Sequence, residues 1–313
     1  MSSSATRAVR TAVIPAAGFG TRFLPATKAV PKEMLPVIDT PTIEFVVSEA
    51  IDSGLDDILI ILSAGKEAIQ AHFGRNGDLE RRLEDTGKAA ELAVVRRFSG
   101  AARIHFIFQH ELAGLGDAVR YARSHVGSEP FAVLLGDTIL EGADGDPPGR
   151  PVTRQLLDVF EARGKSVVAL EEVPVEKVSR YGIVAGEAVD GPAEARGAAL
   201  EGPRTYRLTD LVEKPSPADA PSRLAISSRY VFTSAIFDAL DSAKPGKGGE
   251  IQLTDAMRAL QQSEGMFGLQ FAGRRYDMGN RLDFLKAVIE FALRREDIGR
   301  DLAEWLKGIA DGL

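Results

Sequence analysis

The chain contains no cysteine in its 313 residues. It therefore cannot form a disulfide, use a thiol nucleophile or hold a metal ion through thiolates. Its start, residues 7–18, loosely imitates a signal peptide, but Pro15 and Gly18 cut the apolar run short and a first strand explains the segment better. With no targeting segment and no use for an oxidising compartment, we expect a cytoplasmic protein.

Long hydrophobic runs and an excess of basic residues are also lacking. The longest apolar stretches, such as residues 58–62, are far too short to span a bilayer, so no membrane partner is expected. The net charge of −7 argues against nucleic acid as the main partner, because a duplex-binding protein needs a broad basic face. Small anionic substrates, in contrast, need only local positive charge.

Two common catalytic signatures are missing as well. The four histidines show no His-x-x-x-His spacing and no neighbouring cysteines, so zinc chemistry has no support and we expect structural or exposed roles for them. They are His72, His105, His110 and His125. No Gly-x-Ser-x-Gly segment occurs, which removes the commonest sequence sign of an α/β hydrolase.

The arrangement of apolar residues predicts an α/β fold. Short apolar runs alternate with amphipathic stretches through the first half, which is typical of strand-helix-strand units around a mixed, mostly parallel sheet flanked by helices. We expect strands near residues 9–16, 56–62, 104–108, 131–135, 167–170, 206–212 and 229–232. We expect helices near residues 42–51, 78–97 with an interruption at Gly87, 117–125, 234–240 and 252–261.

No segment resembles a clean linker between domains. We expect a flexible N-terminus at 1–10, one domain at 11–280, and C-terminal helices at 281–313 that pack on this domain, with Trp305 buried against it. Loops are expected at 141–151, 186–203 and 215–221, where Gly, Pro and small polar residues are concentrated. The insertion at 142–149 has no predicted role.

A glycine-rich loop follows the first predicted strand, in the segment 14–22. Small residues there let backbone N–H groups approach a phosphate or a base, although a tight turn is the simpler alternative. A dinucleotide-binding fingerprint would place a third glycine where Phe23 stands, and no Gly-Lys-Ser or Gly-Lys-Thr follows as in a P-loop. A nicotinamide-dependent oxidoreductase therefore remains only as the alternative from another class.

Positive charge is concentrated just after this loop. The segment 18–32 contains Arg22, Lys28 and Lys32 and no acidic residue, in a chain that is acidic overall. This local excess favours a binding site for a triphosphate, and exposed loop lysines are the alternative. Three prolines keep the segment out of a helix and predict an extended loop over a pocket. They are Pro25, Pro31 and Pro36.

Two distant carboxylates are candidates for a metal site. Asp137 follows a predicted strand at its carboxyl end, where open α/β sheets place their ligands, and Asp277 precedes a predicted helix. Each alone is adequately explained as a turn or capping residue. If the fold joins them, they suit Mg²⁺ together with phosphate oxygens. Glu213 and Lys214, at the end of another strand, offer an acceptor for sugar hydroxyls and a cation for a phosphate.

Taken together, six segments resemble the bacterial UTP-glucose-1-phosphate uridylyltransferases, in that family's order and from about Thr11 to about Trp305. They are AAGFGTR at 16–22, LPATK at 24–28, PKEMLP at 31–36, EKP at 213–215, GEIQLTDA at 249–256 and D-x-G-N at 277–280. The resemblance implies a fold of the nucleotide-diphospho-sugar transferase type and a homo-oligomer, either a dimer or a tetramer. It also implies UTP and glucose 1-phosphate as substrates and Mg²⁺ as cofactor.

The resemblance also implies roles for individual residues. Ala16, Ala17 and Gly18 would lie against the uracil, in one nucleotide loop with Gly20 and Thr21, and Gln109 and Gly114 would complete recognition of the base. Arg22 and Lys32 would hold the triphosphate, and Asp137 and Asp277 would bind Mg²⁺. Gly182, Glu213 and Lys214 would contact the glucose phosphate. The catalytic set implied is Arg22, Lys32, Asp137 and Lys214.

Two departures from that family stand out. Related uridylyltransferases commonly have His where this chain has Asp117, and Pro where it has Gly136. The Leu-Gly-Asp form is similar to the thymidylyltransferases, so a thymidylyltransferase acting on the same sugar phosphate is the nearest alternative. A catalytically inactive relative would be expected to have lost some of the charged residues that this chain retains. These are Arg22, Lys32, Asp137 and Asp277.

Overall fold

The structure, a computed structural model, describes residues 8–143, 149–189 and 203–312. Residues 1–7 of the expected N-terminal tail lie outside the described residues, as do parts of the insertion at 142–149 and of the expected loop at 186–203. The first part of that loop, up to Ala188, belongs to a strand. Among the described residues, no helix combines the length and the apolar character needed to cross a membrane.

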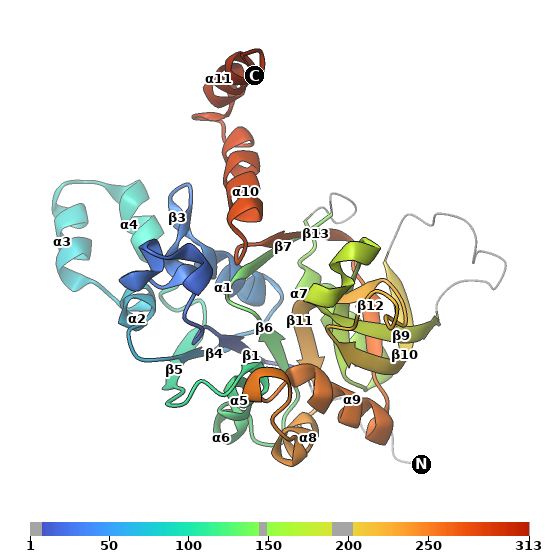
Figure 1. Cartoon of the computed structure of the whole chain (residues 1–313). Coiled ribbons are helices and arrows are strands. Elements are labelled where there is room, and N and C mark those ends of the chain that lie inside the picture. Colours follow the sequence, from blue (N-terminus) through green and yellow to red (C-terminus); the bar gives the residue numbers. More distant parts are fainter. Residues whose placement is uncertain (1–7, 144–148, 190–202, 313) are drawn as a thin grey trace.

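A nine-stranded mixed sheet forms the centre of the molecule, in the order β5-β4-β1-β6-β11-β8-β12-β10-β9 (Figure 1). The strands in that order are Arg103–Phe108, Asp57–Leu62, Thr11–Pro15, Phe131–Leu134, Leu224–Phe232, Val167–Glu172, Phe267–Gln270, Arg204–Glu213 and Gly182–Ala188. The pairs β5–β4, β4–β1, β1–β6 and β8–β12 are parallel. The pairs β6–β11, β11–β8, β12–β10 and β10–β9 are antiparallel.

The expected α/β fold with a mixed sheet is therefore present, but the expectation of a mostly parallel sheet is not confirmed. The first half of the chain supplies three of the four parallel pairs, because helices connect its strands, and the fourth is β8–β12. In the second half β9 and β10 follow one another with no described helix between them, and such strands pair antiparallel.

Helices cover both faces of the sheet, and the side chains of β1 alternate between the two resulting cores. Ala12 and Ile14 pack with α1 (Thr42–Asp52) and α7 (Val152–Arg163), whereas Val13 packs on the opposite face. That second face is covered by α5 (Leu115–Arg120), α8 (Ile236–Ser242) and α9 (Leu253–Glu264), which lie below the sheet in Figure 1. Burial on both faces explains why β4 is an almost continuous apolar run.

Two of the predicted helices are each divided in two. The charged segment at 78–97 forms α3 (Gly77–Asp85) and α4 (Ala89–Val95), and Gly87 between them has a φ of +69°, which matches the predicted interruption. The segment at 117–125 forms α5 and α6 (Arg123–Val126). Helix α2 (Glu67–Phe73) and helix α7 were not predicted.

Two small antiparallel pairs and a helical arm complete the fold. Strand β13 (Gly273–Asp277) pairs with β7 (Thr138–Gly142), and β2 (Pro36–Val37) pairs with β3 (Thr40–Pro41). Asn280 caps α10 (Arg281–Leu293) by accepting hydrogen bonds from the N–H groups of Leu282 and Asp283, at 2.9 and 3.2 Å.

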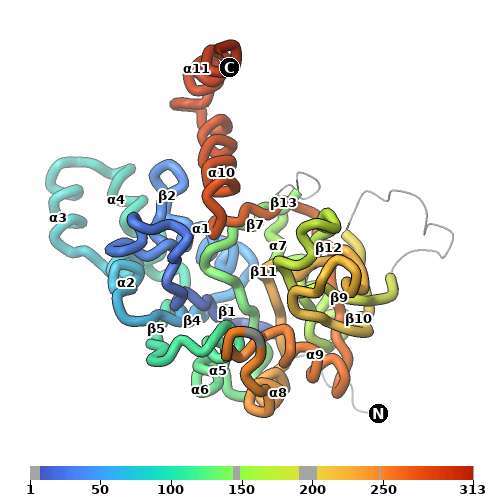
Figure 2. Tube along the Cα trace, viewed as in Figure 1, coloured from blue at the N-terminus to red at the C-terminus, as the bar shows by residue number. Residues whose placement is uncertain are grey.

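The arm formed by α10 and α11 (Gly299–Ala310) extends outward from the sheet domain (Figures 1 and 2). One side of α10, including Phe284 and Phe291, packs on Tyr276 and Met278 of the main body. Trp305 lies on α11, beyond this contact, and is 62% exposed. The expectation that Trp305 packs against the main body is therefore wrong, because α11 continues away from the sheet.

A buried ion pair connects four elements around the sheet. The Arg229 side chain, only 1% exposed, donates to Glu49 Oε2 from Nε at 3.0 Å and from Nη2 at 2.6 Å. The other oxygen of Glu49 accepts from the N–H and the hydroxyl of Thr153, at 3.0 and 2.7 Å. Arg229 Nη2 also donates to the carbonyl oxygen of Thr138, at 2.9 Å. These hydrogen bonds join α1, α7, β7 and β11.

Replacing Glu49 by Gln should destabilise the protein by about 3 to 5 kcal/mol, because it leaves the Arg229 charge buried without a counter-charge. Urea unfolding followed by circular dichroism measures the change. The matched control is Glu187→Gln, which removes a carboxylate from an exposed pair with Arg207 and should leave the midpoint nearly unchanged. Equal midpoints for the two variants would contradict a structural role for the buried pair.

Candidate active site

The glycine-rich loop leaves the carboxyl end of β1 between two neighbouring strands. Ala16 and Ala17 are buried, with exposed fractions of 2% and 5%. The Ala16 N–H donates to the Ile61 carbonyl at 2.8 Å, and the Ser63 hydroxyl donates to the Ala17 carbonyl at 2.7 Å. These bonds fix the loop against β4, so that Gly18 is the first residue to reach solvent.

Gly20 is required by the close approach of Lys32. Its φ is +65°, and a Cβ at this position would lie only 2.9 Å from Lys32 Cβ. A Cβ on Gly18 would lie 3.6 Å from Lys32 Nζ, so the ammonium group sits directly beside the loop. The small residues therefore make room for a lysine side chain as well as for a ligand.

The basic segment after the loop was expected to be extended but contains three short 3₁₀ turns. They span Thr21–Phe23, Ala26–Lys28 and Lys32–Met34. The Thr27 hydroxyl donates to the Gly20 carbonyl at 2.8 Å and closes the segment back on the loop. Prolines exclude a longer helix, as predicted, but they tolerate single turns.

Lys32 and Asp137 form the central ion pair, with 2.5 Å between Nζ and Oδ2. Burial by itself lowers the pKa of Lys32, but the adjacent Asp137 and Glu33 carboxylates outweigh it and the net pKa is raised. Burial likewise tends to raise the pKa of Asp137, and the Lys32 ammonium holds it below its ordinary value. Both groups are therefore charged near neutral pH.

Arg22, Asp137 and Asp277 meet around Gly279. Strand pairing places Asp277 opposite Thr138, the residue after Asp137, and the Met278 N–H donates to the Asp137 carbonyl at 3.1 Å. A Cβ on Gly279 would lie 3.1 Å from Asp277 Oδ1, 3.6 Å from Asp137 Oδ2 and 3.6 Å from Arg22 Nη1. The structure thus brings together two carboxylates and a guanidinium from three distant parts of the chain.

Glu33 and Lys66 were not assigned a role from the sequence, yet they form a buried ion pair next to Lys32. Glu33 Oε2 lies 2.6 Å from Lys66 Nζ, and Glu33 Oε1 lies 3.9 Å from Lys32 Nζ. Burial raises the pKa of Glu33 and lowers the pKa of Lys66, each against the effect of its partner. Lys66 follows the carboxyl end of β4, so the rule that selected Asp137 could also have selected it.

Gln109 has a buried partner that fixes its orientation. Its Nε2 donates to Asp117 Oδ2 at 2.7 Å, and the two residues are only 4% and 9% exposed. Because a carboxylate accepts hydrogen bonds, the NH₂ end of the amide must face Asp117. The Oε1 atom of Gln109 is then left to accept a hydrogen bond from another donor.

The segment 249–256 explains the conformation of the loop at Gly114. Gly114 has a φ of +102°, and a Cβ there would lie 2.8 Å from Glu250 Cβ. The Ile251 N–H donates to the Ala113 carbonyl at 2.7 Å, and the Gly116 N–H donates to the Ile251 carbonyl at 2.9 Å. The loop at Gly114 and the segment 249–256, which are far apart in the sequence, are therefore joined by backbone hydrogen bonds.

The predicted sugar-phosphate residues lie together at the paired ends of β9 and β10. Gly182 is opposite Glu213 in the strand register, and Glu213 Oε2 accepts from the Thr254 hydroxyl at 2.7 Å. Lys214 Nζ lies 2.7 Å from Glu213 Oε1. Lys214 also has a φ of +45°, an unusual conformation for a residue with a side chain, which turns the chain at the strand end.

The hydroxyl of Tyr230 on β11 is influenced by the charges of both Glu213 and Asp137. Burial is the largest cause that raises the pKa of its hydroxyl, and the carboxylates of Glu213 and Asp137 both add to the effect. The pKa of this one buried hydroxyl therefore depends on a residue of the predicted sugar-phosphate group and on a residue of the carboxylate cluster.

A cavity of about 440 Å³ is lined by most of the predicted nucleotide residues. They are Ala17, Gly18, Gly20, Thr21, Lys32, Gln109, Gly114 and Asp137. Ala16 is buried next to this lining. Arg22 and Asp277 do not line the cavity, but both lie near Asp137 around Gly279. Gly182, Glu213 and Lys214 do not line the cavity, so the sugar-phosphate residues lie apart from it. A larger hollow of about 780 Å³, between α1, β7 and β13, contains none of these residues.

Comparisons with known proteins agree on one kind of relative. The profile of the nucleotidyl transferase family matches residues 11–292. The UTP-glucose-1-phosphate uridylyltransferase of Bacillus subtilis (strain 168) is 45% identical over 301 residues, which is 96% of this chain and 97% of that protein.

Two solved structures are similar along nearly their whole length. A UDP-glucose pyrophosphorylase in complex with UDP-glucose is 35% identical with a TM-score of 0.80, covering 92% of this chain and all of that one. A UTP-bound UDP-glucose pyrophosphorylase of Acinetobacter baumannii is 33% identical with a TM-score of 0.82, covering 95% and 98% of the two chains.

Proposed function

Since the chain belongs to the nucleotidyl transferase family, among its UTP-glucose-1-phosphate uridylyltransferases, we propose that it transfers the uridylyl group of UTP to glucose 1-phosphate. The products are UDP-glucose and pyrophosphate. The observation that carries the residue assignments is the convergence of Arg22, Lys32, Asp137 and Asp277 at the end of the nucleotide cavity. Such a cluster offers both cations for phosphates and carboxylates for a metal ion.

The reaction needs positioned cations more than it needs a base. A sugar phosphate is already an anion near neutral pH, so one of its oxygens can attack the α-phosphorus of UTP directly. A bond forms between this oxygen and the α-phosphorus, and the bond from the α-phosphorus to the bridging oxygen breaks, releasing pyrophosphate. The main barrier is bringing two anions together in line, which requires oriented positive charge.

Lys32 and Arg22 are the residues placed to supply that charge. The Lys32 ammonium lines the cavity beside Gly18, and its raised pKa keeps it protonated over the physiological range. Arg22 Nη1 donates to the Gly279 carbonyl at 3.3 Å, which directs the guanidinium toward the two carboxylates. We assign both side chains to the α-phosphate and the departing pyrophosphate.

The carboxylates of Asp137 and Asp277 fit a magnesium ion. Mg²⁺ is commonly bound by one or two carboxylates together with phosphate oxygens and water, and both aspartates lie beside Gly279. When bound, the ion would neutralise charge on the phosphates. Lys32 holds Asp137 ionised, and the Gly279 N–H, which donates to Asp277 Oδ1 at 2.9 Å, fixes the second carboxylate.

Glu213 and Lys214 are assigned to the glucose phosphate. The carboxylate of Glu213 already accepts from Thr254, so its position is set before a sugar hydroxyl binds. Lys214 is exposed apart from its contact with Glu213 and can turn its ammonium toward an incoming phosphate. Gly182 packs closely beside them, because a Cβ there would lie 2.8 Å from Ile226 Cδ1, 3.0 Å from Thr254 Oγ1 and 3.3 Å from Glu213 Oε2.

Pyrophosphate release, measured with each nucleoside triphosphate against a panel of sugar 1-phosphates, tests this function. We expect the highest kcat/KM with UTP and glucose 1-phosphate. Lys32→Ala should lower kcat by roughly 10²- to 10³-fold, because it removes a preorganised charge at the phosphates. Asp137→Asn and Asp277→Asn should each abolish turnover that depends on Mg²⁺.

The matched control is Lys88→Ala, which removes an exposed lysine between α3 and α4 and should leave kcat nearly unchanged. Circular dichroism establishes that each variant is folded. Near-normal turnover in both aspartate variants would refute the metal assignment. A higher kcat/KM with dTTP than with UTP would instead favour the thymidylyltransferase alternative.

The orientation of Gln109 makes a specific prediction about the base. Uracil and thymine present the same N3–H donor, which the free Oε1 of Gln109 can accept, whereas cytosine presents an acceptor at that position. Asp117→Asn allows the Gln109 amide to turn over, so the preference for UTP over CTP should fall by about tenfold or more, while the ratio of UTP to dTTP changes little. Competition kinetics with the three triphosphates measure these ratios.

Asp241→Asn is the control, because Asp241 is a half-exposed carboxylate paired with Arg123 on the surface. It should leave all three triphosphate ratios as in the parent protein. An unchanged ratio of UTP to CTP in the Asp117 variant would show that Asp117 does not orient the base contact.

The outer face of the helical arm supports a homo-oligomer. Leu282, Leu285, Ile289 and Leu293 of α10 are exposed, and their spacing places them on one side of the helix, opposite Phe284 and Phe291. Ile298, Trp305 and Ile309 continue the exposed apolar surface onto α11. A contiguous apolar surface of this kind is typical of an interface. We therefore assign the contact between subunits to this arm.

Leu285→Lys should shift the molar mass measured by light scattering toward that of one 33.6 kDa chain, because a charge is placed within the apolar stripe. The parent protein should have a mass of two or four chains. Leu79→Lys, a substitution at an exposed leucine of α3, is the control and should leave the mass unchanged. A parent protein with the mass of a single chain would contradict the assignment.

A further inference from the structure

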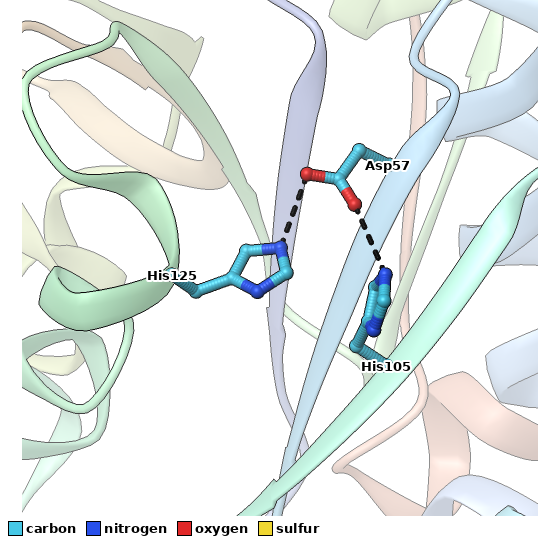
Figure 3. Close-up of side chains that lie close together, drawn as sticks. All are labelled: Asp57, His105 and His125. Carbon is cyan, nitrogen blue, oxygen red and sulfur yellow. Dashed lines mark hydrogen bonds and ion pairs between the residues drawn. The ribbon is translucent and has the colours of Figure 1, made fainter.

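Two histidines and an aspartate lie together at the end of the sheet opposite the nucleotide cavity. Asp57 is the first residue of β4, His105 belongs to β5 and His125 belongs to α6 (Figure 3). Asp57 is in register with Thr11, where β1 begins, whereas the glycine-rich loop follows the other end of β1. The cluster is therefore separate from the site described above, and no step of the proposed reaction uses it.

Both imidazole rings direct a nitrogen at the same carboxylate. His125 Nε2 lies 3.0 Å from Asp57 Oδ2, and His105 Nε2 lies 3.4 Å from Asp57 Oδ1. The two ring centroids are 4.9 Å apart. One ligand atom from each residue can be chosen so that all three lie within 4.8 Å of one another.

These separations suit a four-coordinate metal ion. With bonds of about 2.0 to 2.1 Å, tetrahedral zinc holds its ligand atoms about 3.3 to 3.4 Å apart. The two nitrogen-to-oxygen distances are near that value but end on different oxygens of Asp57, and one ligand atom from each residue can be chosen so that all three lie within 4.8 Å. His105 is 47% exposed, so solvent can reach the cluster and supply the remaining ligands. To bind an ion, both imidazoles must turn toward one oxygen of Asp57.

The ligand types select the class of ion. Two imidazoles with one carboxylate suit zinc and similar divalent transition metals, whereas Mg²⁺ prefers oxygen ligands alone. The Thr11 hydroxyl donates to Asp57 Oδ2 at 3.0 Å and steadies the carboxylate from behind, as outer partners do in metal sites. Arg103 is the competing cation, but its Nη2 is 4.0 Å from Asp57 Oδ1 and its side chain is 65% exposed, so it can withdraw into solvent.

We propose that Asp57, His105 and His125 form a binding site for a divalent transition metal ion of the zinc class. The ion joins α6 to the edge of the sheet formed by β4 and β5. The expectation that zinc chemistry has no support considered only the spacing of the histidines in the sequence. The fold brings two of them together from different elements, so that prediction is revised.

Isothermal titration of the full-length protein with Zn²⁺, in a large excess of Mg²⁺ to occupy the Asp137 and Asp277 carboxylates, tests this site. One Zn²⁺ should bind per chain. His105→Ala and Asp57→Asn should each weaken that binding by at least about tenfold, and His110→Ala, at an exposed histidine outside the cluster, should not. Absence of zinc binding, or equal binding by the parent and both cluster variants, would overturn the proposal.

A second measurement on the unaltered protein does not depend on how the variants fold. In ¹⁵N spectra of the imidazole groups, addition of Zn²⁺ should shift the resonances of His105 and His125 together. The resonances of His72 and His110 should stay in place. Shifts confined to His72 or His110, or no shift at all, would refute the site.

Discussion

The buried pair of Arg229 and Glu49 fixes the backbone at the start of β7, next to Asp137. Arg229 Nη2 donates to the carbonyl of Thr138, the residue directly after Asp137, and Glu49 fixes that guanidinium from α1. The position of Asp137 in turn sets the contact with Lys32 and the register of β13, which carries Asp277. A charge pair inside the core therefore supports the arrangement of charges at the surface of the cavity.

In the candidate active site, the Lys32 ammonium lies close to the carboxylates of Asp137 and Glu33. The chain has a net charge of −7, yet its cavity offers Lys32 to an anionic substrate and keeps acidic partners directly behind it. Glu33 and Asp137 keep Lys32 protonated despite its burial. In the proposed reaction, Lys32 would attract the triphosphate while the carboxylates bind the metal ion, because each charge has a fixed neighbour before a ligand binds.

Sequence patterns predicted the parallel half of the sheet well, because strands buried on both faces are continuous apolar runs, as in β4. They did not predict β13, whose residues are mainly glycine, arginine and aspartate, or strands β9 and β12. Strands β8, β10 and β11 were predicted near residues 167–170, 206–212 and 229–232, but their antiparallel pairing was not. Motifs identified Lys32, Asp137 and Asp277 as candidates. Their meeting depends on strand pairing across the whole chain, as does the cluster of His105 and His125, and local spacing carries no information about such contacts.

The junction between β13 and α10 has a mechanical consequence. Asp277 ends the strand and Asn280 caps the helix, so α10 begins immediately after the turn that carries Asp277. The arm is not one continuous helix, because residues 294–298 separate α10 from α11, the helix that carries Trp305. A contact that displaces α10 would therefore also move the backbone next to the Asp277 carboxylate.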